Sequence, residues 1–99
     1  MEERLNVFSR RETVLVAGGG GFIGGHLART LSERGFQARS VDIKPIDDWY
    51  QIPHGVEARR VDLSELADCH EAVRGIDTIY NVAGNMGAAV RTAFTPQLM

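Results

Sequence analysis

The chain has 99 residues, of which 43% are hydrophobic and 24% charged, and its formal net charge is −2. This length suffices for one small domain, and the mixing of acids and bases leaves no basic surface for nucleic acid or an anionic membrane. There is no apolar run near the about 20 residues that span a bilayer, no secretory signal in residues 1–11 and no partner for the single cysteine, so a cytoplasmic location is expected.

A short aliphatic run predicts the first strand. Residues 13–17 are almost wholly apolar and end at glycines, as is typical of a strand buried on both faces. From residue 22 the period becomes that of an amphipathic helix, with Ile23, Leu27 and Leu31 on its apolar face and Gly35 as its stop. The first strand therefore leads into a helix that packs on it.

Two further strands follow, separated by a loop. Residues 37–42 form a strand that ends in an acid, and residues 57–61 form a shorter one. Between them, residues 44–55 contain two prolines and no clear helical period, which predicts a loop with one turn.

A second helix and a fourth strand complete the pattern. Ser64 is predicted to cap a helix that runs to Arg74, and residues 76–82 are predicted to form the strand. The apolar side of this helix is expected to hold Leu66, Cys69 or His70, and Val73.

Strands that alternate with helices predict an α/β fold with a parallel sheet. Right-handed crossovers give four parallel strands in the order 3-2-1-4, which is a partial Rossmann fold. We expect a polar lead-in over residues 1–11, the N-terminal half of a dinucleotide-binding domain over residues 12–87, and a divergent tail over residues 88–99. A ligand would bind where the strand order reverses, beyond the carboxyl ends of the first and fourth strands.

The glycine-rich stretch after the first strand contains a GxxGxxG spacing at Gly18, Gly21 and Gly24. Gly18 would permit the tight turn, Gly21 would let backbone N–H groups approach a pyrophosphate, and Gly24 would let the helix pack closely. A tight strand-to-helix turn can use the same spacing for structural reasons alone, so the motif needs its context.

That context is an acid at the end of the next strand. Asp42 follows the glycines at about the 20-residue interval of a ribose-binding carboxylate. Its charge would accept ribose hydroxyls and repel the 2′-phosphate of NADP, so NAD is the favoured cofactor. Lys44 weakens this inference, because its ammonium can neutralise a phosphate, although it can equally pair with Asp47 or Asp48.

At this point residues 12–87 resemble the extended short-chain dehydrogenases, the family of NAD-dependent sugar-nucleotide epimerases and dehydratases. The resemblance lies in four blocks in the family's order: residues 16–27 (VAGGGGFIGGHL), Val41-Asp42, Val61-Asp62-Leu63, and residues 77–84 (DTIYNVAG). It implies that Asp62 holds the adenine amino group, that Leu63 lies beside the ring, and that Ala83-Gly84 packs against the cofactor. The implied cofactor-binding residues are Gly18, Gly21, Phe22, Ile23, Gly24, Asp42, Lys44, Asp62, Leu63, Ala83 and Gly84.

A narrower resemblance points to the GDP-mannose 3,5-epimerase branch. It lies in residues 42–45, in residues 48–50 with the pair Trp49-Tyr50, and in residues 85–87. The aromatic pair can equally be a hydrophobic plug for a loop.

The family's proton and hydride chemistry uses a Tyr-x-x-x-Lys pair together with NAD. Neither Tyr50 nor Tyr80 has a lysine four residues later, and the resemblance ends after Gly87. No catalytic or metal-binding residue is therefore assigned, and His26 is interpreted as a packing residue.

We expect the NAD-binding portion of such an enzyme, truncated before its catalytic pair and inactive alone. Its nucleotide-sugar substrate would be met only in a full-length parent. The alternatives are a stand-alone NAD-binding regulatory module and a fragment of another sugar-nucleotide 4-epimerase or dehydratase. The fourth strand would lie at a sheet edge, so self-association is also expected.

Overall fold

The computed structural model describes residues 11–83. Their strands form one parallel sheet in the order β3-β2-β1-β4, which confirms the predicted partial Rossmann fold. The strands are β1 (Thr13–Ala17), β2 (Gln37–Asp42), β3 (Glu57–Arg60) and β4 (Thr78–Asn81). The last two are slightly shorter than predicted.

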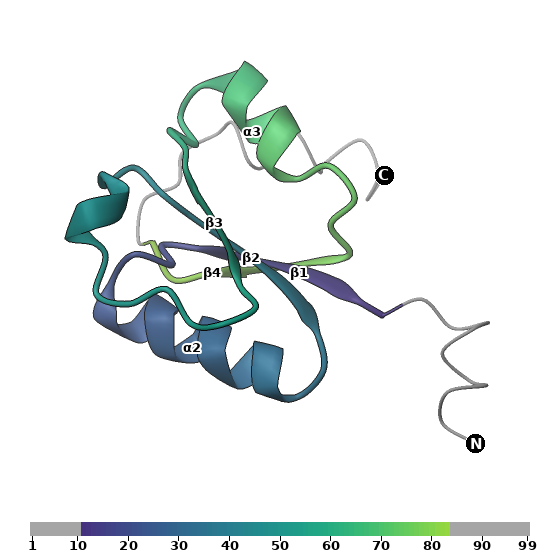
Figure 1. Ribbon diagram of the computed structural model, residues 1–99. Helices are drawn as coiled ribbons and strands as arrows, with labels where there is room; N and C mark the ends of the chain where they lie inside the picture. Colours follow the sequence, from purple (N-terminus) through teal and green to yellow (C-terminus); the bar gives the residue numbers. More distant parts are fainter. Residues whose placement is uncertain (1–10, 84–99) are drawn as a thin grey trace.

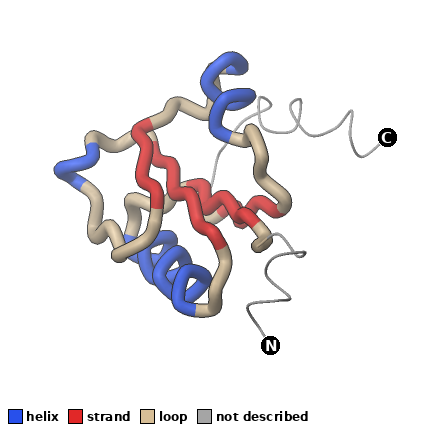
Figure 2. Tube along the Cα trace, turned by 45° about the vertical axis from the view of Figure 1, so that its right-hand side comes forward, coloured by secondary structure: helices blue, strands red, loops and turns tan. Residues whose placement is uncertain are grey.

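Two helices cover opposite faces of this sheet. Helix α2 (Phe22–Glu33) lies on one face and helix α3 (Leu66–Ala72) on the other, and both views show this arrangement (Figures 1 and 2). The connection from β2 to β3 contains a single 3₁₀ turn, η1 (Ile46–Asp48), which confirms the predicted loop with one turn.

Strand β1 is the centre of the core because both of its faces are covered. Successive side chains of a strand point to opposite faces, and here Val14 and Val16 pack with residues of α2, whereas Leu15 and Ala17 pack with residues of α3. The buried thiol of Cys69 belongs to the α3 layer. Burial raises the pKa of this thiol, as expected for a packing residue that stays protonated.

The apolar face of α2 differs from the prediction. Ile23 is 67% exposed, and the buried positions are Gly24, Gly25, Ala28 and Leu31. The prediction was wrong at Ile23 because it followed the large side chains, whereas the helix approaches the preceding turn through its glycines. A Cβ atom on Gly24 would lie only 2.1 Å from the carbonyl oxygen of Gly18.

The start of α3 also differs from the prediction. The helix begins at Leu66 after Glu65, whose side chain makes no capping hydrogen bond, so Ser64 is not the cap. Ser64 instead donates its hydroxyl to Asp62, two residues earlier. Serine bonds local backbone and side-chain groups in turns as readily as at helix starts, and the turn takes it here. Leu66, expected on the apolar side, is exposed, while Cys69 and Ala72 are buried.

One side chain ties α3 to the sheet. Arg39 of β2 donates through one Nη atom to the carbonyl oxygens of Ala72 and Arg74, at 2.7 and 3.0 Å, and through Nε to Glu57. A cation at the carboxyl end of a helix satisfies its last carbonyl groups and opposes its dipole. This contact fixes the far end of the helix that follows Asp62 and Leu63.

Candidate functional site

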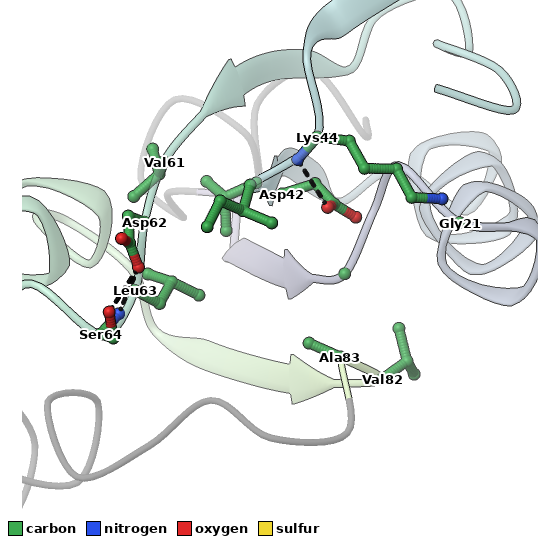
Figure 3. A pocket seen from close by; sticks show the side chains of 12 residues that line it. Gly21, Asp42, Lys44, Val61, Asp62, Leu63, Ser64, Val82 and Ala83 are labelled. Carbon is green, nitrogen blue, oxygen red and sulfur yellow. Dashed lines mark hydrogen bonds between the residues drawn. The ribbon is translucent and has the colours of Figure 1, made fainter. Parts of the chain in front are cut away.

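A pocket of about 330 Å³ lies beyond the carboxyl ends of the strands, where the predicted strand reversal places a ligand. Its walls come from the glycine-rich turn after β1, from the residues that end β2 and β3, and from the residues after β4 (Figure 3). The predicted site residues that line it are Gly18, Gly21, Asp42, Lys44, Asp62, Leu63 and Ala83.

Four predicted residues stand apart from this lining. Phe22, Ile23 and Gly24 form the first turn of α2 and do not line the pocket, and Gly84 lies outside the described residues. The side chains of Phe22 and Ile23 are exposed. What this turn offers is its backbone, because the first N–H groups of a helix have no partner within the helix and form its positive end.

The turn after β1 needs glycine at Gly18. Its φ angle is +92°, and a Cβ atom there would lie 2.8 Å from the backbone nitrogen of Ala83. The amides of Gly18 and Gly19 both donate to the carbonyl oxygen of Val41, at 2.9 and 3.0 Å. The turn is thereby held against both the end of β2 and the segment that follows β4.

The carboxylate of Asp42 joins two segments of the pocket wall. Its Oδ2 accepts the N–H of Gly20 at 2.9 Å, and its Oδ1 accepts the N–H of Lys44 at 3.1 Å. Each carboxylate oxygen has two acceptor sites, so both oxygens can still accept a hydroxyl. The charge is therefore fixed in place and still open to a ligand.

A second pair of hydrogen bonds completes a closed ring of contacts through Asp42, Gly20, Tyr50, Trp49 and Lys44. Trp49 donates its Nε1–H to the carbonyl oxygen of Lys44, and the N–H of Tyr50 donates to the carbonyl oxygen of Gly20, both at 2.9 Å. The indole is nearly buried against Gly20. The segment after η1 thus braces both the glycine turn and the residue after Asp42.

The aromatic pair divides between two environments. Trp49 is buried and fills the loop, as the hydrophobic-plug interpretation of the aromatic pair predicted. Tyr50 is exposed, and its ring lies 4.9 Å from that of Phe22 and 5.6 Å from that of His26. His26, interpreted from the sequence as a packing residue, is exposed and forms an aromatic cluster with Phe22 of α2 and Tyr50. Sequence reasoning missed the Trp49 bond, for which the only signal was the indole N–H, a donor that needs a partner when buried.

Asp62 lies on the opposite wall of the pocket from Gly21 (Figure 3). Its Oδ1 accepts both the hydroxyl and the amide of Ser64, at 2.6 and 3.0 Å. The Ser64 hydroxyl, followed by its amide, holds the pKa of Asp62 below the ordinary value of 3.8. Sequence reasoning missed Ser64 as a pocket residue, although the Asp-x-Ser spacing is typical of such a turn.

Residues 11–83 contain no cluster of three or more histidine, cysteine, aspartate and glutamate side chains that could hold a metal ion. Within the same span, no helix has the length and apolar character needed to cross a membrane.

We predict that Ser64→Ala raises the pKa of Asp62 toward 3.8, because the shorter of the two bonds to the carboxylate is lost. Since the folded pKa is lowered, this bond favours the fold above pH 3.8, and its contribution is lost as the pH falls through the folded pKa. A carboxyl-detected NMR titration measures the value. The control is Ser32→Ala on α2, which should leave Asp62 unchanged, and an unaltered pKa in Ser64→Ala would contradict the assignment.

Comparison with known proteins places the chain in a family. The model of the NAD dependent epimerase/dehydratase family matches residues 14–98. This range includes residues 88–98, although we expected the resemblance to end at Gly87, and those residues lie outside the described part of the chain. No curated protein sequence matches the chain.

Solved structures similar to the chain include proteins in complex with NAD. The UDP-glucose 4-epimerase of Thermus thermophilus in complex with NAD is 31% identical, with a TM-score of 0.61 over 74% of this chain and 24% of that one. MoeE5 in complex with UDP-glucuronic acid and NAD is 30% identical, with a TM-score of 0.60 over 77% and 24% of the two chains. The uronate dehydrogenase of Agrobacterium tumefaciens, also solved with NAD, is 25% identical, with a TM-score of 0.62 over 76% and 27%.

The chain thus spans about a quarter of the length of these proteins. Because the family model covers most of the 99 residues, the chain belongs to the NAD-dependent epimerase/dehydratase family.

Proposed function

We propose that the pocket binds the adenosine half of NAD, and that the chain is the NAD-binding portion of a sugar-nucleotide epimerase or dehydratase. The observation that carries the proposal is the Asp42 carboxylate, which is fixed by two backbone N–H groups at the pocket wall and keeps acceptor sites open. The family match and the NAD complexes of related structures support it.

The residues present fit the adenosine half of a dinucleotide. In this proposal Asp42 accepts the ribose hydroxyls, and Asp62 accepts the adenine amino group through Oδ2, which takes no hydrogen bond from a described residue. Leu63, whose side chain forms part of the pocket lining, lies beside the ring.

The pyrophosphate would lie at the start of α2. Unpaired N–H groups at a helix start bind anions, and Gly21 has only one neighbour near its missing Cβ, the carbonyl oxygen of Gly18 at 3.6 Å. The phosphates can therefore approach the backbone. Gly18 and Ala83, which line the pocket, would lie against the cofactor.

Electrostatics favours NAD over NADP at this site. A carboxylate about 4 Å from a phosphate charge costs roughly 4 kcal/mol at an effective dielectric constant of about 20, whereas a hydrogen bond to a ribose hydroxyl contributes about 1 kcal/mol. Both the lost hydrogen bond and the added repulsion weaken the binding of NADP relative to NAD. When the 2′ position carries a phosphate, Asp42 loses its hydroxyl partner and faces a second negative charge.

When bound, NAD supplies the hydride acceptor and donor of the family's chemistry. In this proposal the described residues hold only its adenosine end, and no Tyr-x-x-x-Lys pair occurs in the 99 residues. We therefore propose that this chain binds NAD without turnover, and that its nucleotide-sugar substrate is met in a longer protein.

A GDP-mannose substrate is the narrower form of this proposal. Of the residues that suggested it, Trp49 and Tyr50 brace the glycine turn, and Lys44 accepts a bond from Trp49. Their described contacts support the cofactor site rather than a sugar site. The proposal at this level therefore rests on residues 85–87, outside the described part.

We predict that Asp42→Ala weakens NAD binding by about tenfold and narrows the margin over NADP, because ribose hydroxyls lose their acceptor and the 2′-phosphate loses a repelling charge. Titration calorimetry with both dinucleotides measures the two affinities. Asp48→Ala, which removes an exposed acid of η1 outside the pocket lining, is the control. Equal losses for both cofactors would count against the role of Asp42.

We predict that Gly21→Val abolishes NAD binding while far-UV circular dichroism and the Tm change little. Gly21 has an extended conformation (φ −87°, ψ 178°) that valine adopts readily, and a branched side chain there would occupy the approach of the pyrophosphate. Unaltered NAD affinity would show that this glycine serves only the fold.

Gly24→Ala provides the contrast to Gly21→Val. Its Cβ would collide with the carbonyl oxygen of Gly18, so this variant should lose about 1–3 kcal/mol of stability.

We also propose that the chain self-associates through β4. Among the described strands β4 lies at an edge of the sheet, and Tyr80 and Val82 expose apolar surface beside it. Unpaired strand edges and apolar surface favour association. Sedimentation velocity at two protein concentrations is expected to show a concentration-dependent average mass, and a compact monomer at both would refute the proposal.

A further inference from the structure

A second pocket lies at the opposite end of the sheet from the proposed cofactor site. It has a volume of about 240 Å³, and its lining includes Thr13, Gln37 and Glu57, the first residues of β1, β2 and β3. The two pockets share no lining residue. Sites for drug-sized ligands measure about 300–1,000 Å³, so a ligand of this second pocket would be smaller than a nucleotide.

Arg39 brings a positive charge to this pocket and keeps part of its hydrogen-bonding capacity. Its Nε donates to Glu57, and one Nη atom donates to the carbonyl oxygens of Ala72 and Arg74. A guanidinium has five N–H donors, so the other Nη atom keeps two, and it meets no acceptor among the described residues. Within residues 11–83 only the Ser40 hydroxyl is both fully buried and without a partner, so this Nη atom can be reached by a ligand.

Gln37 and two glycines supply further donors. Gln37 accepts the Thr13 hydroxyl through Oε1 at 3.3 Å, which leaves its amide NH₂ group to donate. Gly55 and Gly75 also line the pocket, and their backbone N–H groups meet no acceptor in the described part of the chain. Several donors around one small space suit a carboxylate, because its two oxygens accept about four hydrogen bonds.

Glu57 is the acceptor of this pocket. Its Oε1 accepts from Arg39 and its Oε2 from Arg59, and each oxygen has a second acceptor site. Burial raises the pKa of Glu57, but the hydrogen bonds from the two arginines outweigh burial and hold the pKa below the ordinary value of 4.5. The side chain is therefore ionised at neutral pH, and a ligand group that contacts it has to be a donor.

We propose that this pocket is a second ligand site, which binds a small carboxylate with a hydroxyl or ammonium group on the adjacent carbon. The carboxylate accepts from Arg39 and Gln37, and the adjacent group donates to Glu57. Arg39 and Arg59 together exceed the charge of Glu57 by one positive charge, so the local field favours an anion. This site is independent of NAD binding.

Four small molecules separate the parts of this chemistry. Glycerate and serine share a carbon skeleton and carry a hydroxyl and an ammonium group, respectively, beside the carboxylate. In 3-hydroxypropionate the group beside the carboxylate is missing, and glycerol has no carboxylate. A comparison of the four therefore tests the adjacent donor and the carboxylate one at a time.

The experiment titrates each molecule into the ¹⁵N-labelled 99-residue chain and follows the NMR shifts of the Gly55 and Gly75 amides and of the Gln37 side chain. The better of glycerate and serine should bind about tenfold more tightly than 3-hydroxypropionate or glycerol, because each of these two lacks one charged hydrogen bond. Whichever of the pair binds better identifies the adjacent donor.

Arg39→Gln should weaken the better ligand about tenfold, because the carboxylate loses its charged partner. The matched control is Arg74→Gln, which removes an equal charge from an exposed residue outside the pocket lining and should leave the affinity almost unchanged.

Gln37→Leu keeps the inference testable if Arg39→Gln loosens α3. This exposed residue makes no contact with α3 among the printed hydrogen bonds of the described residues, and its loss should weaken the better ligand about fivefold. Gln51→Leu is its control, since Gln51 bonds Arg29 and lies outside the pocket lining.

Shifts confined to Gly18 and Gly21 would place the anion in the cofactor pocket and overturn the inference. It also fails if none of the four molecules shifts the signals of Gly55 and Gly75, or if 3-hydroxypropionate and glycerol bind as tightly as the better ligand. Wild-type affinity in Gln37→Leu would overturn it as well. None of these results bears on the proposed NAD site, which Asp42→Ala tests separately.

Discussion

The position of one carboxylate organises this end of the molecule. Asp42 accepts one backbone N–H from the turn before α2 and one from the segment after β2, so a single negative charge joins these two segments. Hydrogen bonds to a charged acceptor are stronger than those between neutral groups. Bonds from Trp49 and Tyr50 return to the same two segments, and the ring they complete keeps the glycine turn and the acid in one fixed relation.

Such a ring lowers the cost of binding. An acid on a mobile loop would have to be ordered when a ligand arrives, and ordering a backbone costs about 1–2 kcal/mol per residue. Here the protein's own N–H groups have already ordered it. Tyr50 contributes through its backbone and Trp49 through its indole N–H, and the ring uses only the backbone groups of Lys44.

The fold could be predicted from the sequence because its signals are local. Residues 13–17 form an apolar run because β1 is covered on both faces, and Asp42 is recognisable because it follows the glycines at a set distance. The failures have a common physical origin. Ile23 and Ser64 were placed by their intrinsic preferences, whereas their positions depend on a glycine contact with Gly18 and on a turn that ends in Asp62.

Contacts between distant segments lay beyond any pattern in the chain. The hydrogen bond of Trp49 to Lys44 depends on how the loop folds back over the glycine turn. The small side chain of Ser40 is required because Gly19 packs directly against it. A Cβ atom on Gly19 would lie 2.4 Å from the Cβ of Ser40, and the buried Ser40 hydroxyl has no hydrogen-bond partner among residues 11–83. A buried hydroxyl without a hydrogen bond destabilises the fold by about 1–3 kcal/mol. The fold accepts this cost because the glycine turn packs closely against β2 at this position.

The two charged side chains of this wall, Asp42 and Lys44, differ in how firmly they are held. Asp42 has a short side chain whose two oxygens are already held, so its field acts on a ligand without loss of rotamer freedom. Lys44 carries its charge on a flexible stem and would lose up to about 2 kcal/mol of side-chain entropy when it grips a phosphate. The two opposite charges on this wall therefore differ in the entropy that is lost when each contacts a ligand. Under the proposed function, the pre-ordered carboxylate acts more strongly on a ligand than the ammonium does.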